Sequence, residues 1–117
     1  MSIKQGLVAE AYAKDYLVQQ GLQWIESNFR CPCGEIDLIM RDGDYLVFTE
    51  VRARKSARYG NALESIHGGK QKKLVKTASL YLLMKYKKST PPSRFDVVTF
   101  DGIPPRVQWI KNAFSLT

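Results

Sequence analysis

Charged residues recur at every second position in two short stretches that are otherwise apolar. Glu35 and Asp37 alternate with apolar residues in GEIDLI, and Glu50 and Arg52 alternate in VFTEVRAR. Side chains of a β-strand alternate between the two faces of a sheet, so each pair points to one side of its strand. Gathered carboxylates repel one another and resist ionisation when partly buried. They require a cationic partner, either an arginine or a hard divalent ion with oxygen ligands.

A hairpin joins the two stretches. Asp42-Gly43 suits a tight turn between them, because glycine adopts positive φ without steric cost. With these residues at the tip, the predicted register pairs Arg41 with Asp44, Met40 with Tyr45, Ile39 with Leu46, Asp37 with Phe48 and Glu35 with Glu50. One predicted face carries Ile36, Leu38, Met40, Tyr45, Val47, Thr49 and Val51. The other face is apolar near the turn and ends in Glu35, Asp37, Glu50 and Arg52, so we expect both faces to be covered.

The cluster at the end of this hairpin has two explanations. Arg52 could pair with Glu35, Asp37 or Glu50 in a salt-bridge network, or Mg²⁺ or Mn²⁺ could bind between the carboxylates. A further acid, Glu10, lies on the first predicted helix. It lies on or beside an apolar stripe, but it could equally form a surface ion pair with Lys14, four residues on.

Hydrophobic periodicity predicts seven elements in the order αβββαββ. Helices are predicted over residues 3–20 and 70–87, and strands over 22–29, 35–40, 45–53, 94–100 and 107–114. Gly21 is a C′ glycine that ends the first helix, and residues 54–69 form a loop. The inward stripe of the second helix comprises Leu74, Val75, Ala78, Tyr81 and Leu82, with Gln71 on the same side. A strand, a helix and a returning strand imply a right-handed parallel crossover. The prediction is one α/β domain over residues 1–117, with a mixed five-stranded sheet flanked by helices.

The amino-acid composition, and above all the net charge, indicates what kind of molecule the protein binds. The 117 residues are 44% hydrophobic and 25% charged, and carry a formal net charge of +7. This excess of basic residues favours a polyanionic partner, above all nucleic acid. We expect no membrane contact, because there is no long apolar run, and a cytoplasmic location, because the N-terminus carries no secretion signal. Cys31 and Cys33 are the only cysteines and His67 is the only histidine, so reduced thiols in a loop are favoured over a zinc site.

Basic residues in two segments could contact phosphates. Arg54, Lys55 and Arg58 follow the third strand, and a second group on the helix comprises Lys70, Lys72, Lys73 and Lys76. They could bind nucleic acid in one groove with the acids, although each lysine could equally be solvated helix surface. No recognition helix for base sequence is present, so we expect selection by shape, on a duplex, a branch or a junction.

Motifs along nearly the whole chain resemble the YraN-like family of small bacterial proteins. They are Gly34-Glu35-Ile36-Asp37-Leu38-Ile39, Val47-Phe48-Thr49-Glu50-Val51-Arg52-Ala53-Arg54, Glu10-Ala11, Asn28-Phe29-Arg30, Arg94-Phe95-Asp96-Val97-Val98 and Trp109-Ile110-Lys111-Asn112-Ala113-Phe114. That family resembles the PD-(D/E)xK restriction-endonuclease-like superfamily, which includes archaeal Holliday-junction resolvases. The resemblance implies a restriction-endonuclease-like core and a Mg²⁺- or Mn²⁺-dependent endonuclease on structured or branched DNA. Resolvases act as dimers, but no homodimer face can be read in this sequence.

The same resemblance implies roles for individual residues. Asp37 corresponds to the metal-binding aspartate of the motif, Glu50 to its second acid and Glu10 to the acid of the first helix. Gln71 matches a polar residue on the next helix, and Glu35 lies on the same face as Asp37. The departure is Arg52, where the motif has lysine. Arginine keeps the charge but does not readily release a proton. A DNA- or RNA-binding protein without catalysis on the same fold is therefore the alternative function.

Overall fold

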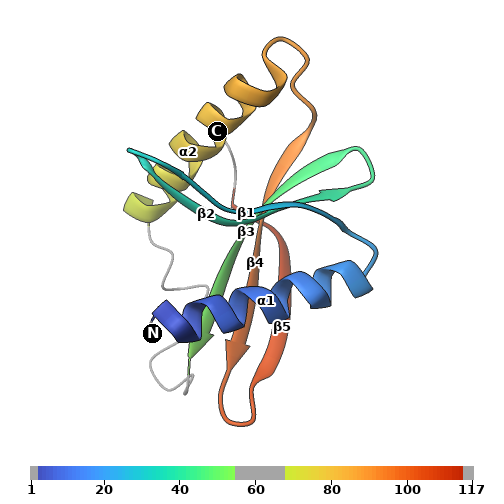
Figure 1. Cartoon of the computed structure of the whole chain (residues 1–117), viewed down its shortest axis with the longest axis vertical. Coiled ribbons are helices and arrows are strands. Elements are labelled where there is room, and N and C mark those ends of the chain that lie inside the picture. The colour runs from blue at the N-terminus through green and yellow to red at the C-terminus, as the bar shows by residue number, and fades with distance from the viewer. Residues whose placement is uncertain (1–2, 55–67, 115–117) are drawn as a thin grey trace.

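The computed structural model describes residues 3–54 and 68–114, and over them the predicted order αβββαββ is confirmed (Figure 1). The helices and strands are α1 (Ile3–Gln19), β1 (Gln23–Cys31), β2 (Gly34–Asp42), β3 (Tyr45–Arg54), α2 (Gly68–Tyr86), β4 (Ser93–Asp101) and β5 (Arg106–Phe114). The five strands form one mixed sheet in the order β1-β2-β3-β4-β5. Strands β3 and β4 are parallel, and the other three pairs are antiparallel.

The two helices cover opposite faces of this sheet. Helix α1 packs on the face that includes Val47 and Val51, and its own core residues are Ala9, Ala13 and Leu17. Helix α2 packs on the face that includes Leu46 and Phe48, through Leu74, Ala78 and Tyr81. The expectation that both faces of the hairpin are covered is therefore confirmed. The predicted inward stripe of α2 is also confirmed, with Val75 and Leu82 partly buried beside its core residues.

Helix α1 ends where the glycine predicts. Gly21 has φ +101°, which suits glycine, and its amide donates to the carbonyl of Val18 at 3.0 Å. The amide of Leu22 donates to the carbonyl of Leu17 at 3.1 Å, and both side chains lie in the same core cluster. This pair of hydrogen bonds is a Schellman motif, which turns the chain directly into β1.

The β2–β3 hairpin has a different register from the predicted one. Asp42 pairs with Tyr45, Ile39 with Phe48 and Leu38 with Thr49, so the partners are shifted by two residues. The two-residue loop is Gly43-Asp44, because Gly43 takes the positive φ of +61° at the first loop position. A shift of two keeps every β3 side chain on its predicted face, since the side-chain period of a strand is also two.

The face predicted for Ile36 is wrong. Ile36 packs against α2 with Ile39 and Phe48, whereas Leu38 packs against α1. The switch falls at Asp37, opposite an irregular stretch of β1 where Asn28 has φ +58°. Pairing between β2 and β3 ends at Leu38 and Thr49 on this side, so the two strands separate where the acidic residues begin.

Most of the predicted loop over residues 54–69 lies outside the described residues, and so do Lys55, Arg58 and His67. At its described ends the loop prediction is wrong, because Arg54 ends β3 and Gly68 and Gly69 begin α2. No helix in the described part of the chain has both the length and the apolar character needed to cross a membrane.

Candidate metal centre

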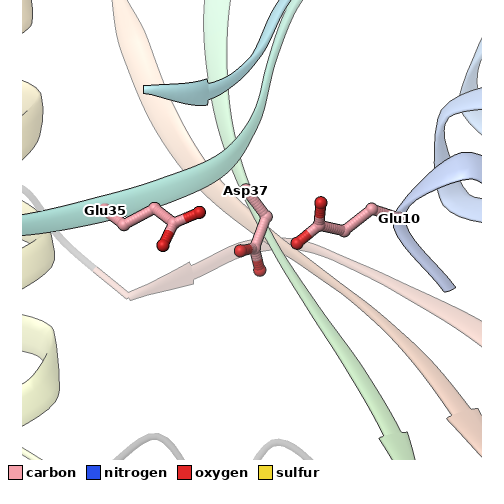
Figure 2. A group of neighbouring side chains, drawn as sticks. All are labelled: Glu10, Glu35 and Asp37. Carbon is pink, nitrogen blue, oxygen red and sulfur yellow. The ribbon is translucent and has the colours of Figure 1, made fainter. Parts of the chain in front are cut away.

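Three carboxylates from two elements converge where β2 separates from β3. Glu10 of α1 and Glu35 and Asp37 of β2 each offer one oxygen, and these oxygens lie within 4.8 Å of one another. Glu10 and Glu35 point toward Asp37 from opposite sides (Figure 2). All three residues are partly buried. Helix α1 covers the face of the sheet opposite α2. The separation of β2 from β3 at this point allows Glu10 of α1 to approach the two acids of β2.

Asp37 is held in place by the backbone of the neighbouring strand. The amide of Val51 donates a 2.9 Å hydrogen bond to Asp37 Oδ2. The carboxylate therefore takes a backbone donor of β3 beyond the last β2–β3 pair. This bond fixes the side chain at the centre of the three acids.

Glu10 belongs to the cluster, which answers the question that the helical periodicity left open. Burial and the nearby charge of Asp37 raise the pKa of Glu10 from 4.5 to about 7. Glu10 Oε2 is buried and has no hydrogen-bond partner. The Lys14 ammonium lies 3.8 Å from the centroid of the Trp24 ring instead. A buried carboxylate oxygen without a partner is costly, and a bound cation would satisfy it.

Glu50 lies beside the three acids but is paired with cations. Its Oε2 is 3.3 Å from Arg52 Nη2 and 3.8 Å from Lys70 Nζ, and the residue is 3% exposed. Burial and Asp37 raise the pKa of Glu50 from 4.5 to about 8, although Arg52 and Lys70 oppose the shift. The salt-bridge explanation of the cluster therefore holds for Glu50. Arg52 forms an ion pair with Glu50, while Glu35 pairs on its exposed side with Arg30, at 3.5 Å.

A pocket of about 350 Å³ lies between the β2–β3 end of the sheet and the start of α2. Acids and bases share its walls, which are lined by Gly34, Glu35, Asp37, Glu50, Arg52, Gly69, Lys70, Lys73 and Leu74. An anionic group that entered it would meet the basic side chains while remaining next to the carboxylates. The pocket is therefore suited to a phosphate bound close to a cation.

The structure divides the basic residues predicted to bind nucleic acid. Lys70 and Lys73 line the pocket, whereas Lys72 and Lys76 are exposed on α2 away from its walls. Gln71 is partly buried and is not among the lining residues. The backbone of Arg54 ends β3, and its side chain is not described.

Sequence reasoning missed three residues that support this site. The side chain of Asn28 hydrogen-bonds Glu10 and lowers its pKa, against the larger effects that raise it. Gly34 allows the β1–β2 turn to approach α2, because a Cβ there would lie 2.9 Å from Thr77 Oγ1. Thr77 is a buried polar residue on the inner side of α2. Asn28 was visible only within a family motif, and no local pattern marks Thr77.

The donor set fits a hard divalent cation. Glu10, Glu35 and Asp37 offer only oxygen, which Mg²⁺ and Mn²⁺ prefer, and Glu10 also has a buried Oε2 without a hydrogen-bond partner. The described cysteines lie elsewhere, at the β1–β2 turn, so no sulfur enters the set. The geometry can hold one such ion beside a pocket with basic walls.

The fold and the site define a small α/β protein with a carboxylate cluster at a pocket lined by both acidic and basic side chains. The chain belongs to the Uncharacterised protein family UPF0102, whose family model matches residues 9–100, and the resemblance to the YraN-like family is thereby confirmed. It is 43% identical to a UPF0102 protein of Legionella pneumophila, over 97% of both chains. A UPF0102 protein of Pseudomonas putida is 48% identical, over 95% of this chain and 93% of the relative. One from a Janthinobacterium strain is 50% identical, over 92% of this chain and 85% of the relative.

Proposed function

We propose that this chain is a divalent-metal-dependent endonuclease that acts on structured or branched DNA. The observation that carries the proposal is the convergence of Glu10, Glu35 and Asp37 within 4.8 Å, at a pocket that basic side chains also line. A nuclease needs a cation at the scissile phosphate and positive charge along the backbone that it holds. The resemblance of the family to the PD-(D/E)xK superfamily supports the same reaction class.

In this proposal Glu10, Glu35 and Asp37 hold Mg²⁺ or Mn²⁺, and Glu50 lies at the edge of the site. When bound, such an ion supplies Lewis-acid stabilisation of the phosphate and lowers the pKa of a coordinated water. Burial and Asp37 raise the pKa of Glu50 to about 8 without an ion, so this acid keeps a proton more readily than a free carboxyl group does. A nearby cation favours the ionised form, and Glu50 would then release that proton as the site fills.

Arg52, Lys70 and Lys73 hold the phosphate in this proposal. Arg52 and Lys70 already lie within 4 Å of Glu50, so their charges are directed toward the acids. Lys73 lines the same pocket one helical turn from Gly69. The planar guanidinium of Arg52 can bind two phosphate oxygens at once, which a lysine cannot do. Gln71 is not among the residues that line the pocket, so we give it no direct contact with the phosphate in this proposal.

The alternative is a DNA- or RNA-binding protein that does not cleave, and the position of Arg52 favours it. The guanidinium is engaged by Glu50 at 3.3 Å, and a guanidinium does not give up a proton in proteins, so it cannot serve as a general base. An arginine at residue 52 is compatible with the binding of a cation and of phosphates. It cannot carry out a catalytic step that needs a neutral amine, which a lysine could supply. The two functions share the site and differ only in the chemistry at residue 52.

A cleavage assay on four-way junctions, flaps and linear duplexes separates these functions. The protein, Arg52→Lys and Asp37→Asn are each incubated with labelled DNA and Mg²⁺ or Mn²⁺. We expect the wild type to cleave the branched substrates, and Asp37→Asn to be inactive. Cleavage by Arg52→Lys alone would establish the binding function for the natural chain. If the wild type and Arg52→Lys both bind DNA and neither cleaves it, the binding function is also established.

Calorimetric titration of Mn²⁺ tests the metal site without any substrate. We expect one ion to bind the wild type and no heat from Asp37→Asn. Absence of heat from both proteins would overturn the metal site and leave the acids as a structural cluster.

A further inference from the structure

Both cysteines of the chain lie together at the β1–β2 turn. Cys31 ends β1 and pairs with Gly34, so Pro32 and Cys33 form the turn between them. The two sulfurs share one hydroxyl: Cys31 Sγ is 3.8 Å and Cys33 Sγ is 3.7 Å from Thr77 Oγ1. Thr77 in turn donates to the carbonyl of Lys73 at 2.8 Å. Both thiols therefore contact the same atom, the hydroxyl oxygen of the buried Thr77 of α2.

The surroundings of these thiols suit oxidation better than metal binding. Both residues are partly exposed, so a small oxidant can reach them. No cluster of three or more metal-ligating residues among the described ranges 3–54 and 68–114 includes either cysteine. A hydrogen bond from the Cys33 side chain lowers the pKa of the Cys31 thiol, aided by Thr77. The two thiols are adjacent, no further metal ligand joins them among the described residues, and one of them is more acidic than usual. These properties are typical of a dithiol that forms a disulfide.

We propose that Cys31 and Cys33 form a reversible dithiol–disulfide couple that displaces Glu35 when it is oxidised. A hydroperoxide is the oxidant. The Cys31 thiolate attacks one peroxide oxygen, the O–O bond breaks, and an alcohol or water leaves while Cys31 becomes a sulfenic acid. The Cys33 thiol then attacks the Cys31 sulfur and the S–O bond breaks. Water leaves with the thiol proton, and the two electrons lost by the sulfurs have reduced the peroxide.

The turn transmits this change to the acids because it is tightly packed. A disulfide holds its two sulfurs about 2 Å apart, whereas each thiol now contacts Thr77 Oγ1, at 3.8 Å and 3.7 Å. The backbone at Gly34 has no room to absorb the movement toward α2, since even a Cβ would lie 2.9 Å from Thr77 Oγ1. Glu35 follows Gly34 directly and is one of the three converging acids. Oxidation thus moves a proposed metal ligand, and this consequence for metal binding rests on the proposed function.

The test uses the full chain and the variant Cys33→Ser, which keeps a hydroxyl at the turn but cannot form the bond. Each protein is treated with hydrogen peroxide and then with dithiothreitol. Mass spectrometry of the intact chain and of its peptides follows the thiols, and amide NMR signals of Gly34 and Glu35 follow the turn. We expect a reversible Cys31–Cys33 disulfide and shifted signals in the wild type only. Mn²⁺ should bind the oxidised form about tenfold more weakly, the lower end of the cost of disturbing the support of a metal ligand.

Several results would overturn the inference. Oxidation that yields only sulfinic acid or cross-linked dimers would exclude the couple, and so would a thiolate-bound metal ion in the protein as purified. A disulfide that leaves the Gly34 and Glu35 signals unchanged would exclude the displacement. If the reduced protein binds no Mn²⁺, the proposed function fails, whereas the mass and NMR measurements still decide the inference.

Discussion

Asp37 Oδ2 accepts the backbone amide of Val51 at 2.9 Å, across the point where β2 leaves β3. A strand that separates from its neighbour leaves backbone donors unpaired, and a buried unpaired donor is costly. The Asp37 carboxylate removes this cost with one oxygen and leaves the other oxygen for the acid cluster. The Asp37 side chain thereby satisfies a backbone amide of β3 and also lies at the centre of the candidate metal site.

Substitutions at Asp37 should separate these two roles. Asp37→Asn keeps an oxygen that accepts the Val51 amide, so we expect no loss of stability but complete loss of Mn²⁺ binding. Asp37→Ala leaves the amide of the buried Val51 unpaired and should lower the free energy of unfolding by about 1–3 kcal/mol. Urea denaturation and calorimetry measure the two effects. Equal stability of the two variants would show that the hydrogen bond contributes nothing.

The sequence was sufficient to predict elements whose boundaries are set locally. Gly21 ends α1 because only a residue that tolerates positive φ completes the Schellman motif. Each strand can be recognised from its own residues, without knowledge of the strands beside it in the sheet. The hairpin register was wrong by two residues because the sequence Asp42-Gly43-Asp44 fits more than one turn, and the choice between turns depends on where Gly43 places its positive φ.

The site was predicted in its residue types but not in its pairing. A strict alternation of faces put Ile36 beside Leu38, and the twist at Asp37 breaks that alternation. No local pattern shows that strands part there, so the approach of Glu10 from the opposite face could only come from the family resemblance. The pairing of Arg52 with Glu50, apart from the three converging acids, depends on distances in three dimensions, which the sequence does not contain.

The metal-free protein should be more stable in mild acid than in mild base. The pKa values of Glu10 and Glu50 are raised from 4.5 to about 7 and about 8. Between pH 4.5 and 8 the folded protein therefore retains protons that the unfolded chain has released. The free energy of unfolding must fall as the pH rises through this window. Thermal denaturation at several pH values in the presence of a chelator measures the slope.

Glu10→Gln provides the control for this pH dependence. Glutamine has no charge to bury, so the variant should gain stability at pH 8, on the order of 1 kcal/mol after allowance for solvent screening. Saturating Mn²⁺ should reverse the slope for the wild type, because the ion binds the ionised acids and its affinity rises with pH. A wild-type stability that is independent of pH from 5 to 8 would contradict the raised pKa values.

The lysines that line the pocket should contribute more to nucleic-acid binding than an exposed lysine away from the pocket. Lys70→Gln and Lys73→Gln each remove one charge from the pocket wall, whereas Lys88→Gln removes an exposed charge beyond the end of the helix. For each pocket variant, the slope of log affinity against log salt should decrease by about 1. Lys88→Gln should leave it unchanged. Fluorescence anisotropy with a labelled junction measures the slope, and equal effects of all three variants would place the DNA elsewhere.

Gly34→Ala should destabilise the fold because of one close approach. The added Cβ would lie 2.9 Å from Thr77 Oγ1, and Gly34 has φ +157°, which L-residues rarely adopt. Steric overlap of this kind costs about 1–3 kcal/mol. Gly68→Ala is the matched control, since a Cβ there meets nothing within 4 Å, and it should keep or raise stability. In a Thr77→Ala background the cost of Gly34→Ala should shrink to the backbone contribution alone, because the overlapping oxygen is gone. Urea denaturation of the four proteins of this cycle gives the coupling energy, and a value of zero would mean that Thr77 does not constrain the turn.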